Sequence, residues 1–263
     1  TLASHINVAT IYAADEAAGL VLAQDFGTAT LATTPEAARP PVYLEAIETL
    51  LTLQTIPDFA PDFLGAYDGA VCAHEASLFV EWYLPYRGIN IKEEAANAWH
   101  KLWQTLGDEL YATTKATIIL RDYHSVNLHW QNCAAQIYRL GVIDVQDALR
   151  GTPAYDVVSL LQDARIDVSA AQTTQSLNHY SQKRFSGDII AQQDFLRDYA
   201  LCGAQRNFKI AGIFVRLAKR DNKPSYLDHL PRIIKYIRHN LNHNSLQPVA
   251  AWLAAYAPDW DSP

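Results

Sequence analysis

An α+β fold is predicted for this chain of 263 residues by two patterns in its sequence. Short runs of β-branched and apolar residues, which are typical of strands, occur near the start and again between residues 116 and 146. Most of the chain after residue 35 spaces its apolar residues three and four apart, as helices do. A strand-containing segment followed by a helical body with a small strand insert is an α+β arrangement.

The opening segment is expected to form two strands, over residues 6–15 and 19–24, joined by a turn at 16–19. Apolar and polar residues alternate only weakly here, so the prediction depends on the enrichment in β-branched and apolar side chains. The sequence Asp-Phe-Gly at 25–27 then ends the run of strands.

Helices are expected after Pro35. Two prolines at 40–41 suit a helix start, and the following turns carry an apolar stripe formed by Leu44, Ile47, Leu50 and Leu51. A loop rich in proline and aspartate follows at 57–69. Further helices are predicted over 76–84 and 91–110, and one face of the second is formed by Ala95, Trp99, Leu102, Leu106 and Leu110.

Between residues 116 and 146 the pattern predicts strands again, over 117–120, 136–140 and 142–145. From residue 154 the spacing is helical, with a break at 151–153 and a turn at 221–224. The helices expected in this part cover 155–164, 168–184, 188–200, 204–219 and 226–241.

Composition narrows the possible partners and the compartment. The net charge of −7 argues against nucleic acid, because phosphate binding needs clustered Lys and Arg. No segment reaches the roughly 18 apolar residues of a membrane span, and the start lacks the basic and apolar regions of a signal peptide. The three distant cysteines, Cys72, Cys133 and Cys202, predict buried free thiols in a reducing compartment, so a cytoplasmic protein is expected.

The most informative segment is Ile-Leu-Arg-Asp-Tyr-His-Ser-Val-Asn at 119–127, in which four residues separate Asp122 from Asn127. A second acid, Asp144, ends an apolar run that a hairpin over 135–145 would bring back beside them. Phosphoryl-transfer enzymes of the kinase superfamily need this set: one carboxylate accepts the proton of the attacking hydroxyl, while an amide oxygen and another carboxylate hold Mg²⁺. The spacing alone is weak, because Asp and Asn are common in loops.

This segment, together with residues 143–164, resembles the aminoglycoside phosphotransferase family. The similarity continues through 81–84, 203–209 and 212–227, and therefore covers most of the chain. It implies a protein-kinase-like two-lobe fold with a mostly helical C-terminal lobe and an incomplete N-terminal lobe. Residues 1–27 would be the remnant of the small nucleotide-binding lobe and hinge, and residues 28–263 the helical catalytic and substrate lobe.

The resemblance also implies ATP and Mg²⁺ as cofactors. Asp122 matches the catalytic base of the family, Asn127 and Asp144 match its magnesium ligands, and Asp156 matches an acid that braces the catalytic loop. The hinge that contacts adenine matches Leu22, Ala23 and Gln24.

Two features depart from the family pattern. The family usually has His two residues before the catalytic Asp, where this chain has Leu120. The Gly-rich phosphate loop and the phosphate-binding Lys should precede residue 1. Together with the absence of methionine from the sequence, this leads us to expect that residues are missing from it.

Within the family, the chain resembles most the bacterial cell-wall-recycling kinases that phosphorylate N-acetylmuramate and N-acetylglucosamine at C1. A nucleotide and an amino sugar are the partners this implies, and the oligomeric state stays open. Glu81 is a candidate acceptor for a sugar hydroxyl, and His124 either braces the catalytic loop or contacts the substrate. Arg206 either binds the lactyl carboxylate of N-acetylmuramate or forms an ordinary salt bridge, on a helix surface or between helices.

Three weaker hypotheses accompany these residues. The aromatic residues Trp82, Tyr83 and Tyr86 belong either to the core or to a sugar-stacking surface. An aminoglycoside kinase is one alternative function, and it would need an acidic pocket for its cationic substrate. The other is a kinase-like binding module without catalysis, suggested by Leu120 and the missing part of the small lobe.

Overall fold

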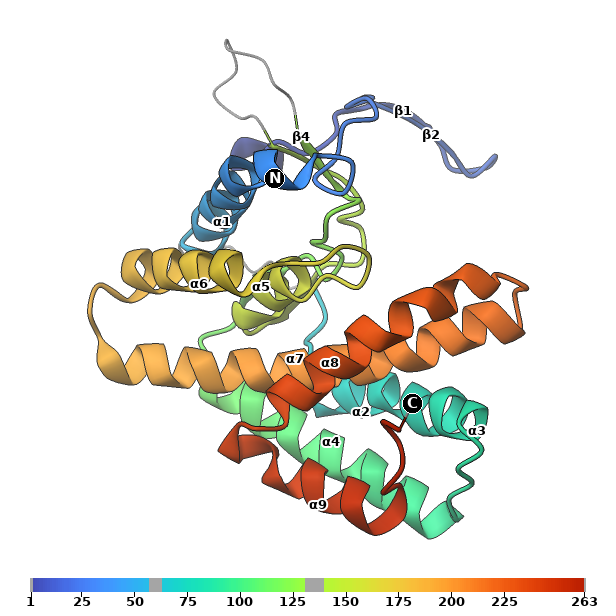
Figure 1. The fold of residues 1–263 in the computed structure, drawn as a ribbon. Coiled ribbons are helices and arrows are strands. Elements are labelled where there is room, and N and C mark those ends of the chain that lie inside the picture. The colour runs from blue at the N-terminus through green and yellow to red at the C-terminus, as the bar shows by residue number, and fades with distance from the viewer. Residues whose placement is uncertain (1, 57–62, 131–139, 263) are drawn as a thin grey trace.

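The structure, a computed structural model, describes residues 2–56, 63–130 and 140–262 (Figure 1). Helices make up most of these residues, and the strands pair in short antiparallel two-stranded sheets. The pairs are β1 (Ile11–Asp15) with β2 (Leu20–Ala23), β3 (Thr117–Ile119) with β6 (Leu149–Gly151), and β4 (Leu128–Trp130) with β5 (Leu140–Val142). The predicted α+β composition is confirmed.

The predicted N-terminal hairpin is present as β1 and β2, but its first strand begins at Ile11 and not at residue 6. Gly19 takes the left-handed conformation (φ 67°) that the turn between the strands requires. The hairpin is exposed and projects away from the helices (Figure 1). The residues before it pair elsewhere: Val8 bridges to Val142, and the Val142 amide donates to the Asn7 carbonyl oxygen at 2.8 Å.

Helix α1 (Pro40–Gln54) begins at the predicted prolines, but the assignment of one residue to its apolar stripe was wrong. Leu44 is 49% exposed, because the helix packs against α6 (Ala170–Phe185) through a neighbouring stripe. The residues that this stripe buries include Tyr43, Ala46, Ile47, Leu50 and Leu51.

The second helical region begins earlier than predicted. Helix α2 (Gly69–Leu78) starts at Asp68, whose carboxylate accepts a hydrogen bond from the Val71 amide at 3.2 Å and caps the helix. It continues through a π-helical turn (Phe79–Tyr83) into the short α3 (Leu84–Tyr86). Tyr83 is buried and its ring stacks on Phe79 at 5.0 Å, so it belongs to the core.

Helix α4 (Glu93–Thr113) is present as predicted and lies along α2. Its buried face differs in detail: Leu102 and Leu106 are only partly buried, whereas Trp103 and Gly107 are buried. Gly107 is needed here because a Cβ atom at this position would come within 2.7 Å of the Gly69 Cα.

The C-terminal helices are α5 (Ala154–Leu161), α6, α7 (Ile189–Lys219), α8 (Leu230–Asn240) and α9 (Gln247–Tyr256). The prediction of separate helices over 188–200 and 204–219 was wrong, since α7 is continuous. Gly203 does not end a helix; it lets the Asn240 side chain approach to 2.6 Å of where a Cβ would lie. Helix α8 begins at Leu230, after a 3-10 turn, and α9 was not predicted.

The strand insert is shorter than expected. Strand β3 agrees with the prediction, whereas β5 ends at Val142, so that Asp144 lies in the following loop. Strands β4 and β6 were missed because three residues are too few for a detectable period. The strand predicted over 136–140 lies outside the described residues, apart from Leu140.

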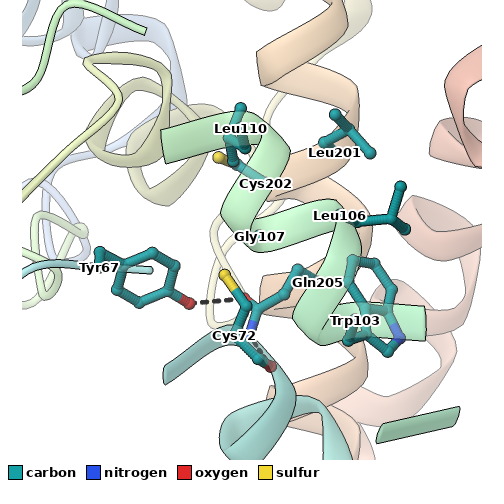
Figure 2. Close-up of a pocket in the computed structure, with 9 residues that line it drawn as sticks. All are labelled: Tyr67, Cys72, Trp103, Leu106, Gly107, Leu110, Leu201, Cys202 and Gln205. Atoms are coloured by element: carbon teal, nitrogen blue, oxygen red, sulfur yellow. Dashed lines mark hydrogen bonds between the residues drawn. The ribbon is translucent and has the colours of Figure 1, made fainter. Parts of the chain in front are cut away.

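Cys72 and Cys202 are buried and free, as predicted, and Cys133 lies outside the described residues. Figure 2 shows both thiols beside a cavity between α2, α4 and α7. The cavity measures only about 10 Å³, room for at most one water, so it is a packing defect and not a ligand site. Among the described residues, no helix has the length and apolar character needed to span a membrane.

Gly212→Ala is expected to destabilise the protein. A Cβ atom on Gly212 of α7 would lie 2.2 Å from the carbonyl oxygen of Leu78 on α2. Alanine ordinarily stabilises a helix by about 1 kcal/mol relative to glycine, but here it would push two helices apart. We expect a net loss of roughly 2 kcal/mol in the free energy of unfolding, measured by chemical denaturation. Gln193→Ala, at an exposed position of α7, is the control. A stabilised Gly212→Ala variant would contradict the packing.

Candidate active site

The loop that carries Asp122 is fixed at its start by hydrogen bonds to the buried carboxylate of Asp156 on α5. Its two oxygens accept hydrogen bonds from the amides of Leu120 (2.7 Å) and Arg121 (2.9 Å). These bonds support Arg121 in the left-handed conformation (φ 69°). The main chain then turns outward, and the Asp122 side chain is 41% exposed. Burial raises the pKa of Asp156 to about 7, against the lowering effect of the two amides and Arg206.

A second buried acid holds the far side of the loop. One oxygen of Asp163 accepts a hydrogen bond from the Ser125 amide and the other accepts one from the Arg165 amide, both at 2.7 Å. Asp122 therefore lies between two main-chain positions that are each fixed by a carboxylate. Sequence reasoning identified Asp156 through the resemblance but missed Asp163, although it belongs to the same similar segment.

The pairing of β4 with β5 brings Asn127 and Asp144 together. Leu128 pairs with Val142. Asn127 directly precedes Leu128, and Asp144 lies two residues after Val142. The Asn127 amide nitrogen lies 3.1 Å from Asp144 Oδ2 and 3.0 Å from the carbonyl oxygen of Asp122. Asp144 has a φ of 64°, so its backbone adopts a conformation that is uncommon outside glycine. The three residues predicted to act together are thus adjacent.

The donor set of this site suits magnesium. Because both hydrogen bonds use the amide nitrogen of Asn127, its amide oxygen is left to bind a cation together with the Asp144 carboxylate. Amide and carboxylate oxygens are the hard ligands that Mg²⁺ prefers, with phosphates and waters completing its shell. In the described ranges no three His, Cys, Asp or Glu side chains cluster to hold a metal by themselves. The residues therefore fit a metal that is shared with a phosphorylated ligand.

Asp122 opens onto a cleft of about 190 Å³ between the catalytic loop and α7. The cleft is also lined by His124 and Arg206, so three of the predicted site residues share one cavity. Its apolar wall comes from α7, and its polar wall is mainly cationic. The cations that line it are Arg121, Arg165, Arg206 and Lys209.

Two of these cations share a buried acid on α2. Arg121 Nη2 lies 2.5 Å and Lys209 Nζ 2.7 Å from Glu75 Oε1, while the Tyr67 hydroxyl donates to Oε2 at 2.6 Å. Burial raises the pKa of Glu75, but Lys209, Tyr67 and Arg121 lower it more, so the net direction is down. Sequence reasoning missed Glu75 and Lys209, because they are far apart in the chain and belong to no local motif.

Arg206 differs from those two cations. It is 4% exposed, and its Nη1 atom is buried without a hydrogen-bond partner. The salt bridge between helices that the sequence left open is not among the ion pairs of the described residues.

His124 lines the same cleft as Asp122, Arg165 and Arg206. Its Nε2 is 3.7 Å from Asp122 Oδ1, beyond hydrogen-bond distance, and its Nδ1 is buried without a partner. Burial, followed by the charges of Arg165 and Arg206, lowers the pKa of His124 to about 3. The ring is therefore neutral at physiological pH.

The other predicted site residues lie elsewhere. Glu81 is exposed on the π-helical turn and does not line the cleft. Leu22 and Ala23 are exposed on β2, and the Gln24 amide donates to the Thr10 carbonyl oxygen at 2.8 Å at the base of the hairpin. Farther along the chain, Thr30 bridges to His129 on β4, the strand that follows Asn127.

The fold and this site define a protein-kinase-like phosphotransferase. The chain belongs to the phosphotransferase enzyme family, whose model matches residues 2–190. The fold is similar to that of a choline/ethanolamine kinase family protein from Mesorhizobium loti (TM-score 0.58, 14% identity, 96% of this chain and 80% of that chain). It is also similar to that of ADP-bound aminoglycoside phosphotransferase APH(2'')-Ib (TM-score 0.55, 13% identity, 88% and 75%). The predicted protein-kinase-like fold is confirmed.

A more similar relative is the N-acetylmuramate/N-acetylglucosamine kinase of Caulobacter vibrioides. It is 33% identical to this chain over 266 aligned residues, which cover 97% of the chain and 72% of the relative. The resemblance stated from the sequence is thereby confirmed for the family and for this group of relatives.

The buried neutral His124 predicts a pH dependence of stability. Between pH 6.5 and 3 the unfolded chain binds a proton at this histidine and the folded protein does not, so stability falls as pH falls. From pH 7 to 5 this histidine alone should remove roughly 2 kcal/mol of the free energy of unfolding. His124→Gln should reduce the pH dependence by that amount, measured by urea denaturation at both pH values. The same change at the exposed His74 is the control. An equal change in the free energy of unfolding between pH 7 and pH 5 for wild type and His124→Gln would contradict the prediction.

Proposed function

We propose that this protein is an ATP- and Mg²⁺-dependent kinase that phosphorylates the anomeric hydroxyl of N-acetylmuramate or N-acetylglucosamine. The name of the Caulobacter relative supports the sugar, and membership of the phosphotransferase family supports the reaction. Such a reaction suits cell-wall recycling in the cytoplasm, where ATP is available. The observation that carries the proposal is the exposed carboxylate of Asp122, set between a fixed pair of oxygen ligands and a cleft.

In this proposal Asp122 is the catalytic base. It orients the C1 hydroxyl of the sugar and accepts its proton while the hydroxyl oxygen bonds to the γ-phosphorus and the bond to the β-phosphate oxygen breaks. Asn127 and Asp144 would hold Mg²⁺, which neutralises charge on the phosphates when bound. The loop bonds from Asp156 and Asp163 keep the base in position, so that little reorganisation is needed during transfer.

The nucleotide would lie on the N-terminal side of the magnesium loop. We assign residues 1–27 to a small nucleotide-binding lobe and hinge, with the backbone of Leu22, Ala23 and Gln24 contacting adenine, and residues 28–263 to the catalytic and substrate lobe. The pairing of Val8 with Val142 supports this assignment, because it places the first segment beside the strand that leads to Asp144.

The charge of the cleft favours a sugar over an aminoglycoside. Aminoglycosides are polycations, and a pocket for them needs acidic walls. Here Arg165 and Arg206 line the cleft without any ion pair among the described residues, and the buried Glu75 is already engaged by two cations. A catalytically inactive binding module is disfavoured because the base and both metal ligands are present and adjacent.

A substrate panel tests the function directly. The full chain with Mg-ATP is offered N-acetylmuramate, N-acetylglucosamine, their methyl glycosides blocked at C1, and kanamycin, with ADP release as the readout. We expect ADP release with at least one free amino sugar, together with loss of that sugar's reducing end, because C1 becomes phosphorylated. We expect no ADP release with the methyl glycosides. Turnover of kanamycin alone would favour the antibiotic kinase, and binding of Mg-ATP without any turnover would favour the binding module.

Asp122→Asn should lower kcat by at least about 1000-fold and leave Mg-ATP binding largely unchanged, because an amide cannot accept the proton. Turnover and nucleotide affinity are measured on the same preparation. Asp147→Asn is the matched control, since Asp147 is an exposed acid nearby that does not line the cleft. A rate for Asp122→Asn within threefold of wild type would remove Asp122 as the base.

A further inference from the structure

Arg206 is a buried cation with an unfilled hydrogen-bonding position and no ion pair among the described residues. It lies in the middle of α7, is only 4% exposed, and leaves Nη1 without a hydrogen-bond partner. A buried charge is costly unless it is paired and hydrogen-bonded. Because Arg206 lines the cleft beside Asp122, a ligand in that cleft can supply the missing partner.

The acids around Arg206 are already occupied. Both oxygens of Asp156 accept hydrogen bonds from amides of the catalytic loop, and both oxygens of Asp163 accept amide hydrogen bonds as well. Glu75 is bonded by Arg121, Lys209 and Tyr67. None of the ion pairs within the described ranges includes Arg206 or Arg165. These two guanidiniums are therefore the cations lining the cleft that form no ion pair within the described ranges, which leaves them available to a ligand.

We propose that Arg206, with Arg165 beside it, forms a carboxylate subsite that selects the acidic sugar N-acetylmuramate over the neutral N-acetylglucosamine. This rests on the proposed sugar kinase function. The two sugars differ by the lactyl ether of N-acetylmuramate, which ends in a carboxylate. A guanidinium can donate two parallel hydrogen bonds to such a group, a geometry that a hydroxyl cannot reproduce.

The layout of the cleft matches the two ends of this substrate. His124 lines the same cleft, with its Nε2 3.7 Å from Asp122 and its ring subject to the charges of Arg165 and Arg206. The base, this imidazole and the two cations thus line one cleft. A sugar whose C1 hydroxyl meets Asp122 would direct its acidic substituent toward the arginines, while Ile210, Ile213 and Phe214 of α7 cover its apolar face.

The test is the ratio of kcat/KM for N-acetylmuramate to kcat/KM for N-acetylglucosamine. Loss of a charge-assisted contact should lower this ratio in Arg206→Gln on the order of 10- to 100-fold. Arg165→Gln should lower it in the same direction by a smaller factor. Arg220→Gln, at an exposed arginine that follows α7, should keep the wild-type ratio. If the ratio stays within threefold of wild type in both cleft variants, the carboxylate subsite is wrong.

A binding measurement separates failure of the subsite from failure of the kinase function. N-acetylmuramate should raise the midpoint of thermal unfolding of the wild-type protein more than N-acetylglucosamine does, and this difference should disappear in Arg206→Gln. Wild-type protein that turns over neither sugar but shows this difference would overturn the kinase function and support the subsite. Turnover of both sugars with equal protection by each would overturn the subsite alone.

Discussion

The site depends on one interaction, the pair of hydrogen bonds from the catalytic-loop amides to the buried carboxylate of Asp156. A loop that leaves a three-residue strand has little structure of its own, and a left-handed residue such as Arg121 is unfavourable there without support. Asp156 supplies this support from the first turn of α5, a helix that is buried along its whole length. Because α5 packs on α7, the same interaction sets where Asp122 stands relative to the cleft wall.

The two sides of Asp122 differ in charge, and this difference organises the chemistry. On one side lie Asn127 and Asp144, the hydrogen-bonded pair that we propose as magnesium ligands. On the other side the cleft offers the guanidiniums of Arg165 and Arg206, while the two other cations that line it, Arg121 and Lys209, share the single carboxylate of Glu75. A phosphotransferase needs this division, since one side must hold a metal with phosphates and the other must hold the acceptor. Glu75 acts as a buried counter-ion that offsets one of the two positive charges of Arg121 and Lys209.

Long amphipathic helices and the N-terminal hairpin could be predicted from the chain, whereas contacts between helices could not. The spacing in α4 and α6 was sufficient because each buries one face, but α7 was wrongly divided into 188–200 and 204–219, and Gly203 lies in the gap between them. A glycine at a helix end and a glycine at a helix crossing look alike in sequence, and only the approach of Asn240 distinguishes them. Leu44 was assigned to the core because its spacing fitted, while the position of α6 selected the adjacent stripe.

From the sequence by itself, the resemblance of its motifs indicated the family and pointed to Asp156 as the acid that braces the loop, while short spacing and local pairing predicted that Asp122, Asn127 and Asp144 lie together. Tertiary structure alone decided that Asp163 anchors the loop, that Arg121 and Lys209 share the single carboxylate of Glu75, and that Arg206 forms no ion pair in the described part of the chain and leaves Nη1 without a hydrogen-bond partner. The physical reason is that the pairing of charges depends on which residues lie close together in the folded structure, whatever their separation along the chain. Glu75 and Lys209 are 134 positions apart, and no local pattern records that they touch.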